Sequence, residues 1–165
     1  METEDLRDVS YEHLNRGYTG QWELMDDLFA WLDLRLYVFY KHHQWLGPKN
    51  DMRNMLGLVV SREEFEHNLV KASQRGLAAS LEGEDAAQLE SSQLAMDLRL
   101  ARTTAEIPLL QLFQRFELDT FEQSCVVLAY AAELDKKYEK LLAYLQDDIT
   151  RKHPSTALAV QLFLP

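Results

Sequence analysis

The sequence predicts an all-α fold, an irregular bundle of about seven helices without a significant sheet. Glycine and proline number only six and four among 165 residues, too few for the many turns of a sheet protein. Apolar residues recur at steps of three and four along most of the chain. With 47% hydrophobic residues, the chain can form one helical domain over 1–165, or two subparts at about 1–83 and 84–165.

The N-terminal part of the chain contains the strongest helix prediction. Residues 1–16 are polar and predict a short, weakly packed helix. From Gln21 to Leu46, two neighbouring apolar rows make a wide face, so this helix should be central and largely buried. Gly47-Pro48 predicts its end. Its solvated side is marked by Asp26, Asp27, Asp33, Lys41 and Gln44.

A connection and a second amphipathic helix follow. Residues 47–60 predict a connection. Ser61 and Glu64 match a capping box, in which the Ser hydroxyl accepts from a backbone N–H and the Glu carboxylate reaches back. The helix that begins there should end near Gly83.

The C-terminal half predicts five further helices. The first spans about Glu84 to Glu106, and Pro108 starts a short one at its first turn. Asp119 and Glu122 form a second capping box. The helix after it should bury Phe121, Cys125, Leu128 and Ala132 and break at Leu134-Asp135; the next has a stripe of Tyr138, Leu141, Leu142 and Leu145.

Pro154-Ser155 predicts the start of the last helix, which is apolar up to the final residues. Natural C-termini more often end in polar residues. The chain is therefore expected to be a piece of a longer polypeptide.

Charge and cysteine content favour a cytoplasmic protein that binds neither nucleic acid nor membrane. The formal net charge is −10, which repels phosphates, and the basic clusters at 41–43 and 151–153 are short. The acidic start is unlike a signal peptide, and no uncharged apolar stretch approaches the ~18 residues that span a bilayer. The only cysteine, Cys125, lies in an apolar run and is interpreted as a buried core residue of a protein in a reducing compartment.

No catalytic, cofactor-binding or metal-binding residue is assigned from the sequence. The six glycines do not form a P-loop, which argues against nucleotide hydrolysis by this chain. Glu64 and His67 have the spacing of a helical ligand pair, but no second such pair accompanies them, as a ferritin-like site requires. The adjacent His42 and His43 diverge on a helix. The favoured interpretation of Glu64 is a helix cap.

Acidic pairs and aromatic residues also have a structural explanation. Asp147-Asp148 precedes Thr150 and Arg151, and the favoured interpretation has one acid accepting from backbone amides in a turn while the other pairs with Arg151. The alternative is a partner or metal site. The remaining acidic pairs are Asp26-Asp27 and Glu84-Asp85. Tyr37 and Tyr40 fall near the solvated side and are candidate contact residues, although core packing is favoured.

Two stretches, Leu56 to Phe65 and Leu112 to Leu162, resemble the N-terminal region of a bacterial family of AAA-type ATPases that are often encoded beside contractile, phage-tail-like injection particles. The first runs from Leu56 to Phe65 and is similar to that family's Gly-Leu-x-hydrophobic-Ser-x-x-Glu segment. The second runs from Leu112 to Leu162, and its most specific block is Tyr144-Leu145-Gln146-Asp147-Asp148. The further matching blocks are Leu112-Phe113, Leu118-x-x-Phe121-Glu122, Ala132-Glu133-Leu134-Asp135-x-x-Tyr138, Thr150-Arg151 and Pro154.

The resemblance implies that the chain is a helical N-terminal domain whose parent protein carries its ATP and Mg²⁺ site far downstream. None of that family's nucleotide-binding residues can be placed on this sequence, because their motifs are not present in it. The expected function is therefore non-catalytic: recruitment of a protein partner to the motor, or packing on the ATPase ring. The alternatives are a free-standing helical protein that self-associates and a helical metal-binding protein using Glu64 and His67.

Overall fold

The computed structural model describes residues 16–43 and 85–164, which contain six helices and no strand. This confirms the all-α prediction for the described part. Predictions for residues 1–15 and 44–84, including the capping box at Ser61–Glu64, fall outside it. The helices are α2 (Gln21–His43), α5 (Asp85–Ala101), α6 (Pro108–Arg115), α7 (Thr120–Leu134), α8 (Lys136–Leu145) and α9 (Thr156–Phe163).

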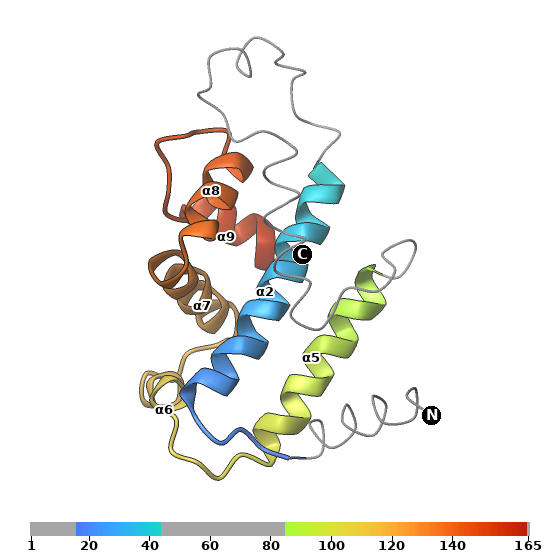
Figure 1. Ribbon diagram of the computed structural model, residues 1–165, viewed down its shortest axis with the longest axis vertical. Helices are drawn as coiled ribbons and strands as arrows, with labels where there is room; N and C mark the ends of the chain where they lie inside the picture. The colour runs from blue at the N-terminus through green and yellow to red at the C-terminus, as the bar shows by residue number, and fades with distance from the viewer. Residues whose placement is uncertain (1–15, 44–84, 165) are drawn as a thin grey trace, which may run out of the picture.

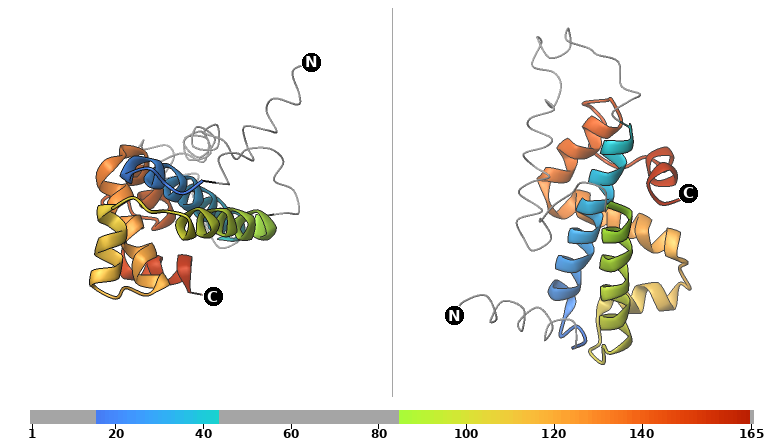
Figure 2. Two further views of the ribbon diagram at one scale, coloured as in Figure 1. Left: turned by 90° about the horizontal axis from the view of Figure 1, so that it is seen from below. Right: turned by 90° about the vertical axis from the view of Figure 1, so that its right-hand side faces the viewer.

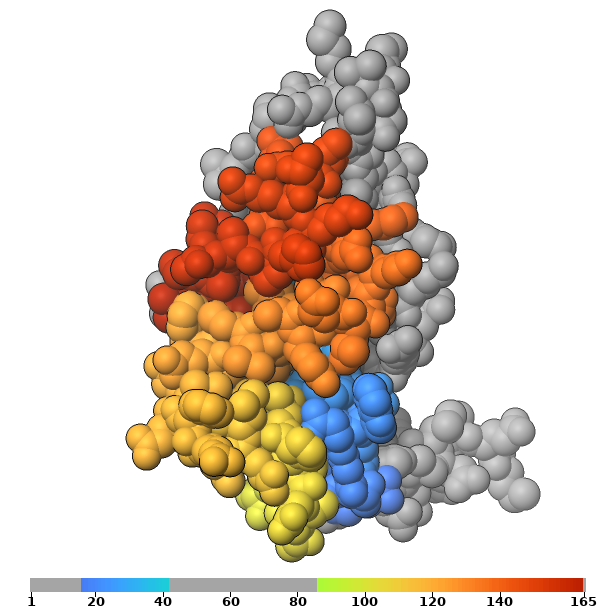
Figure 3. Space-filling model, turned by 90° about the vertical axis from the view of Figure 1, so that its left-hand side faces the viewer, coloured from blue at the N-terminus to red at the C-terminus, as the bar shows by residue number. Residues whose placement is uncertain are grey.

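Helix α2 lies at the centre of the arrangement, as its wide apolar face predicts. Helix α5 runs along one side of α2, and α6, α7, α8 and α9 lie on the other side (Figure 1). Viewed from the α5 side, α5 stands in front of α2 (Figure 2, right). On the opposite side, α6 to α9 form a continuous surface (Figure 3). The chain thus places α2 between one long helix and a layer of shorter ones.

The core forms where α2 meets α7, α8 and α9. Tyr138 of α8 is fully buried, and its ring meets that of Phe29 edge-on with centroids 5.8 Å apart. Trp31 stacks on Phe163 of α9 at 5.9 Å. The largest fully buried side chains come from α2, α7 and α8 and from the residue before α6, because these elements face one shared interior. Besides Tyr138, they are Leu24, Met25, Leu32, Leu36, Ile107, Leu128, Leu141 and Leu142.

Two residues assigned to the solvated side of α2 are buried. The sequence pattern places Asp33 in solvent, but Asp33 is buried and pairs with Lys137 of α8. Tyr40 is buried as well and meets Tyr144 edge-on at 5.8 Å, in agreement with the favoured core interpretation, and Tyr37 is half-buried. Neighbours surround α2 on several sides, so its solvated strip is narrower than its polar residues suggest.

Local signals placed most helix ends correctly. The capping box at α7 is present: Asp119 accepts from the Glu122 N–H at 2.8 Å, and Glu122 accepts from the Asp119 N–H at 2.9 Å. Asp135 ends α7 and caps α8 by accepting from the Lys137 N–H at 2.9 Å. Ser155 caps α9 in the same way. Each of these residues supplies an acceptor for amides that no helical carbonyl can reach.

Two details of the predicted helices are wrong. Helix α5 ends at Ala101 rather than near residue 106, where the N–H groups of Arg102 and Thr103 close a tighter last turn by donating to the carbonyls of Arg99 and Leu100 at 3.1 and 3.0 Å. The buried face of α7 is turned relative to the predicted stripe, since Cys125 is only partly buried. Phe121 is likewise half-buried. The side chains that α7 does bury are Ser124, Val127, Leu128, Ala131 and Ala132.

Candidate functional site

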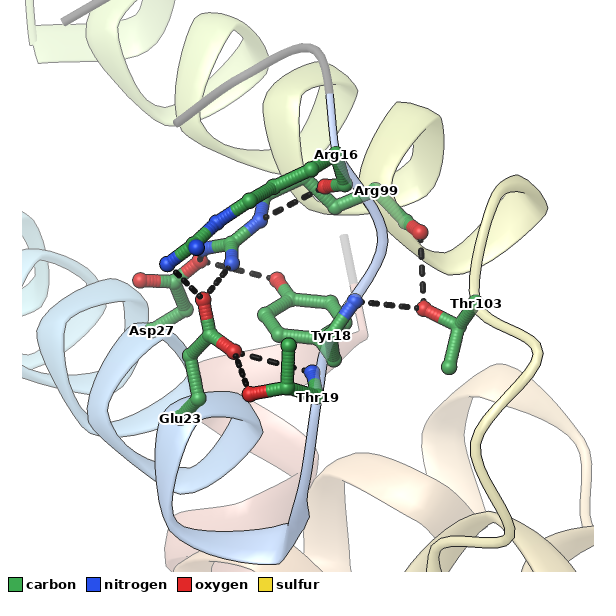
Figure 4. Close-up of polar contacts among 7 residues, drawn as sticks. All are labelled: Arg16, Tyr18, Thr19, Glu23, Asp27, Arg99 and Thr103. Carbon is green, nitrogen blue, oxygen red and sulfur yellow. Dashed lines mark hydrogen bonds and ion pairs between the residues drawn. The ribbon is translucent and has the colours of Figure 1, made fainter. Parts of the chain in front are cut away.

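A polar assembly of seven residues joins the start of α2 to the end of α5 (Figure 4). We call it the Arg99 cluster. It draws side chains from the segment before α2, from the first turns of α2, from the last turn of α5 and from the residues just after α5. Its members are Arg16, Tyr18, Thr19, Glu23, Asp27, Arg99 and Thr103.

Arg99 is the centre of this cluster. Its guanidinium pairs with Asp27 at 2.7 Å and with Glu23, and its Nε donates to the backbone carbonyl of Arg16 at 3.4 Å. It also lies 4.1 Å from the ring centre of Tyr18, close enough for a cation–π contact. Only 7% of the Arg99 side chain is exposed, so these contacts replace its hydration. Arg99 therefore acts as an anchor between α5 and α2.

The segment before α2 is held from both sides. The Tyr18 N–H donates to the Thr103 hydroxyl at 2.9 Å, and that hydroxyl donates to the Arg99 carbonyl at 2.8 Å. The Tyr18 hydroxyl donates to Asp27 at 2.8 Å. The backbone at Gly17 lies very close to the backbone at Arg102. A Cβ placed on Gly17 would be only 2.4 Å from the Arg102 carbonyl oxygen. Only glycine fits this approach without a shift of the backbone.

The same contacts shift two pKa values. The backbone N–H of Thr19 above all, then the Thr19 hydroxyl and Arg99, lower the pKa of Glu23 to about 2. Burial, and then the hydrogen bond to Asp27, raise the pKa of Tyr18. Glu23 is thus held ionised and Tyr18 protonated, which is the state that each hydrogen bond requires.

The Arg99 cluster has the properties of a structural clamp. Two arginines face two carboxylates, so its formal charge balances, and its donors and acceptors contact one another. No charge is left in it to attract a substrate. No sequence motif marks this cluster, because its members lie far apart in the chain. One signal was available: Arg99 lies one turn beyond Met96 on the inner face of α5, where a charge needs a partner.

We predict that Glu23 makes the clamp sensitive to acid. Its pKa is depressed on folding, so the stability it contributes is present above its ordinary value of 4.5 and is lost as the pH falls toward about 2. Glu23→Gln should therefore weaken the dependence of unfolding on pH between about pH 5 and pH 2.5. Urea unfolding at several pH values would measure this dependence. The control is Asp26→Asn, an exposed acid of the same helix; equal effects of the two substitutions would contradict the prediction.

A second buried ion pair joins α2 to α8. Lys137 Nζ lies 2.8 Å from Asp33 Oδ2 and 4.6 Å from the Tyr138 ring centre. Burial raises the pKa of Asp33, and Lys137 opposes that shift. Among the described residues, Asp33 Oδ1 is buried without a hydrogen bond. This pair is another helix-to-helix contact, and its two charges face each other rather than a cleft.

Asp148 performs both structural roles that the sequence pattern predicts for the two acids Asp147 and Asp148 together. It accepts from the Thr150 N–H at 2.9 Å and from the Thr150 hydroxyl at 2.7 Å, and it pairs with Arg151 at 3.2 Å. Thr150, and then Arg151, lower its pKa. Asp147 has a positive φ of 49° and makes the turn after α8. The favoured turn interpretation thus holds, with the roles assigned differently.

Gln146 organises the rest of that turn. Its amide nitrogen donates to the carbonyls of Leu142, Arg151 and His153, at 3.1, 3.3 and 3.0 Å, and its oxygen accepts from the Ser155 N–H at 3.0 Å. One side chain therefore links the end of α8 to the cap of α9. Two residues of the Tyr144–Asp148 block, Gln146 and Asp148, therefore have structural roles in this turn.

The remaining candidate residues do not form a reactive site in the described part. No group of three or more His, Cys, Asp or Glu side chains could hold a metal ion there. Glu64 and His67 lie outside the described residues, so the metal alternative is not tested by them. Cys125 packs against the core, as predicted, but it is only partly buried rather than buried. Burial, then Asp119 and Glu122, raise the pKa of its thiol and so disfavour the reactive thiolate.

Exposed apolar side chains are the other notable surface feature. Trp22 at the start of α2 and Phe116 at the end of α6 are both largely exposed. Pairs one turn apart are also exposed on α5 (Leu94 and Leu98) and on other helices. The further members are Leu112, Tyr130, Leu134, Ile149, Val160 and Leu164. Within the described helices, none is long and apolar enough to cross a bilayer.

Comparison with known proteins identifies a family for almost the whole chain. A family described as "Winged helix domain, variant" matches residues 9–165. No curated protein and no solved structure matches the chain. The family's description names a domain and not an ATPase, so it leaves the parent protein open. Because the match covers well over half of its length, the chain belongs to the winged helix domain, variant, family.

Proposed function

We propose that the chain is a non-catalytic, N-terminal protein-interaction domain of a cytoplasmic, bacterial AAA-type ATPase of the kind encoded with contractile injection particles. In this proposal the domain recruits a protein partner to the motor or packs on the ATPase ring. ATP and Mg²⁺ belong to the motor and not to residues 1–165, which contain no P-loop. The family resemblance over the stretch from Leu112 to Leu162 supports this parent protein. That stretch corresponds to α6, α7, α8 and α9.

The observation that carries a protein-binding role is the contrast between buried charges and exposed apolar residues. The buried charges of Arg99 and Asp33 are engaged with partners inside the domain. Large apolar side chains such as Trp22 and Phe116, by contrast, remain in solvent. Exposed aromatic residues are typical anchors of protein interfaces. The surface therefore offers contacts suited to another protein rather than to a charged small molecule.

The distribution of basic side chains on the helices supports a nucleic-acid-binding role less well than a protein-binding role. A helix that enters a DNA groove needs basic side chains for the phosphates. Helices α7 and α9 contain no lysine or arginine, and the one arginine of α5, Arg99, is buried in the clamp. Of the lysines of α8, Lys137 is paired with Asp33. Together with the net charge of −10, this favours a protein partner.

The experiment that tests this function starts from the native polypeptide in its source cell. Immunoblotting and intact mass spectrometry should find a mass well above that of residues 1–165, and the additional sequence should contain a P-loop. Deleting residues 1–165 from that full-length protein should leave its basal ATP hydrolysis unchanged and abolish its association with the partner protein. A native polypeptide that ends at Pro165, or one without a P-loop, would overturn the ATPase assignment.

The second candidate function is self-association as a free-standing structural protein. The exposed apolar pairs on several helices favour it, because two copies could cover them. It predicts a stable oligomer of residues 1–165 in multi-angle light scattering, whereas the adaptor proposal predicts a monomer of this part. The metal-binding alternative through Glu64 and His67 predicts stoichiometric metal in protein purified without chelators.

A further inference from the structure

We propose that the outer face of α5 is the partner-binding surface, and that it docks an amphipathic helix whose apolar seam is flanked on one side by lysine or arginine. This inference rests on the proposed protein-interaction role and specifies its surface and its partner.

Helix α5 has two apolar faces on opposite sides. Leu89 and Met96 are buried on the side of α2. The opposite side carries an exposed, uncharged stripe spaced by four, three, four and three residues. That spacing is the one at which a helix packs against another helix along a seam. We call this set the α5 stripe, and it consists of Ala87, Ser91, Leu94, Leu98 and Ala101.

The α5 stripe is open in the described structure. Leu94 is 60% exposed and Leu98 is 45% exposed, whereas Leu89 on the inner face is 9% exposed. From the side of α5, no described helix lies in front of it (Figure 2, right). An exposed leucine pair opposite the buried face of a helix offers apolar area that a second helix could cover. Alanine and serine between the leucines leave room for the side chains of an approaching helix.

Charge at the edge of the stripe identifies the kind of helix that fits. Glu90 and Asp97 lie two turns apart along one edge, and both are exposed. In the described part of the chain neither carboxylate forms an ion pair, and Asp97 accepts only from the Gln93 amide at 3.0 Å. Residues at such positions flank the seam of a helix pair and select its partner by charge. An apolar helix with lysine or arginine beside its seam would complement both acids.

The same charges disfavour an antiparallel second copy as the occupant. In an antiparallel pair, equivalent flanking positions of the two helices face each other, so Glu90 and Asp97 would meet the same acids of the other copy. Like charges in contact weaken such a pair. A separate polypeptide with a basic flank avoids this repulsion.

The test uses labelled synthetic helical peptides as probes of residues 1–165 and of the full-length protein. One peptide has leucine and alanine at seam positions and lysine on the flank, and a matched peptide has glutamate in place of each lysine. Fluorescence anisotropy should show saturable binding of the lysine peptide that weakens with added salt. The glutamate peptide should bind at least about tenfold more weakly.

Variants of the stripe and its edge sharpen the test. The double substitution Leu94→Gln with Leu98→Gln should reduce binding at least about tenfold. Glu90→Lys with Asp97→Lys should reverse the preference between the two peptides. The control Leu112→Gln changes an exposed leucine of α6 and should leave binding unchanged. Circular dichroism would verify that each variant is folded.

Several outcomes would overturn the proposal. The proposal is wrong if neither peptide binds, if both bind equally, or if binding does not change with the substitutions at Leu94 and Leu98. A dimer in light scattering that dissociates on the same two substitutions would assign the stripe to a second copy instead. None of these results would bear on whether the native polypeptide carries a P-loop, so failure at α5 is distinguishable from failure of the proposed function.

Discussion

Arg99→Met should lower the free energy of unfolding by about 2–4 kcal/mol. The Arg99 side chain is 7% exposed, and it is the shared cation of Glu23 and Asp27. Its removal leaves two neighbouring carboxylates without that charge. These acids are 23% and 37% exposed, so water compensates in part, and the loss should stay toward the lower end of the range for a fully buried pair. Urea unfolding followed by circular dichroism measures it.

Two comparisons separate the clamp from a general effect of losing an arginine. Arg115→Met removes an exposed arginine at the end of α6 and should change stability by less than about 0.5 kcal/mol. Arg99→Lys keeps the positive charge but loses the forked guanidinium donors that reach two acids. Its loss of stability should therefore lie between the losses expected for Arg99→Met and Arg115→Met. A loss below about 1 kcal/mol for Arg99→Met would show that the cluster does not hold α5 on α2.

Helices and their ends were predictable because the signals are local. Asp119, Asp135 and Ser155 each cap a helix through an amide two or three residues ahead, a relation that is visible in the sequence. Pro108 at the start of α6 is of the same kind. Helical spacing likewise placed α2 at the centre. Such features depend on neighbours in the chain, so they require no knowledge of the tertiary arrangement.

The polar contacts that join helices were not predictable in the same way. Arg99 meets Asp27 across 72 positions of sequence, and Lys137 meets Asp33 across 104. A single acidic residue on a predicted helix is most often exposed to solvent, so the sequence pattern alone places Asp33 on the solvated side of α2. Only the packing of α2 between two layers explains its burial. The same packing decides which apolar face of α5 is inside and which forms the stripe.

The family assignment and the polar turn after α8 differ in how far the sequence pattern alone could predict them. The chain's membership in a winged helix domain family came from a match over residues 9–165, and helical periodicity alone did not suggest it. The Tyr144–Asp148 block is the most specific part of the family resemblance, and the structure gives it a physical role through Gln146 and Asp148. That role is structural, so it is compatible with any function of the domain. The resemblance and the exposed surface remain the basis of the proposed function.

The second large effect is expected at the ion pair between α2 and α8. Lys137→Met should lower the free energy of unfolding by about 3–5 kcal/mol at neutral pH, because it leaves Asp33 buried and unpaired. The side chains of Lys137 and Asp33 are only 14% and 10% exposed, and Asp33 Oδ1 already lacks a hydrogen bond. Urea unfolding at about pH 7 measures the loss.

Two measurements show whether Lys137→Met acts through an unpaired charge or through lost packing. They are the pH dependence of the variant's stability and the effect of adding a second substitution at Asp33. Burial raises the pKa of Asp33, so its protonated form is favoured on folding, and the stability of the variant should rise as the pH falls toward the ordinary aspartate value of 3.8. Adding Asp33→Leu removes the unpaired charge and should restore stability to within about 1 kcal/mol of the original chain or above it. If the double variant were as unstable as Lys137→Met alone, the loss would come from the lysine stem's packing on the Tyr138 ring and not from the buried carboxylate.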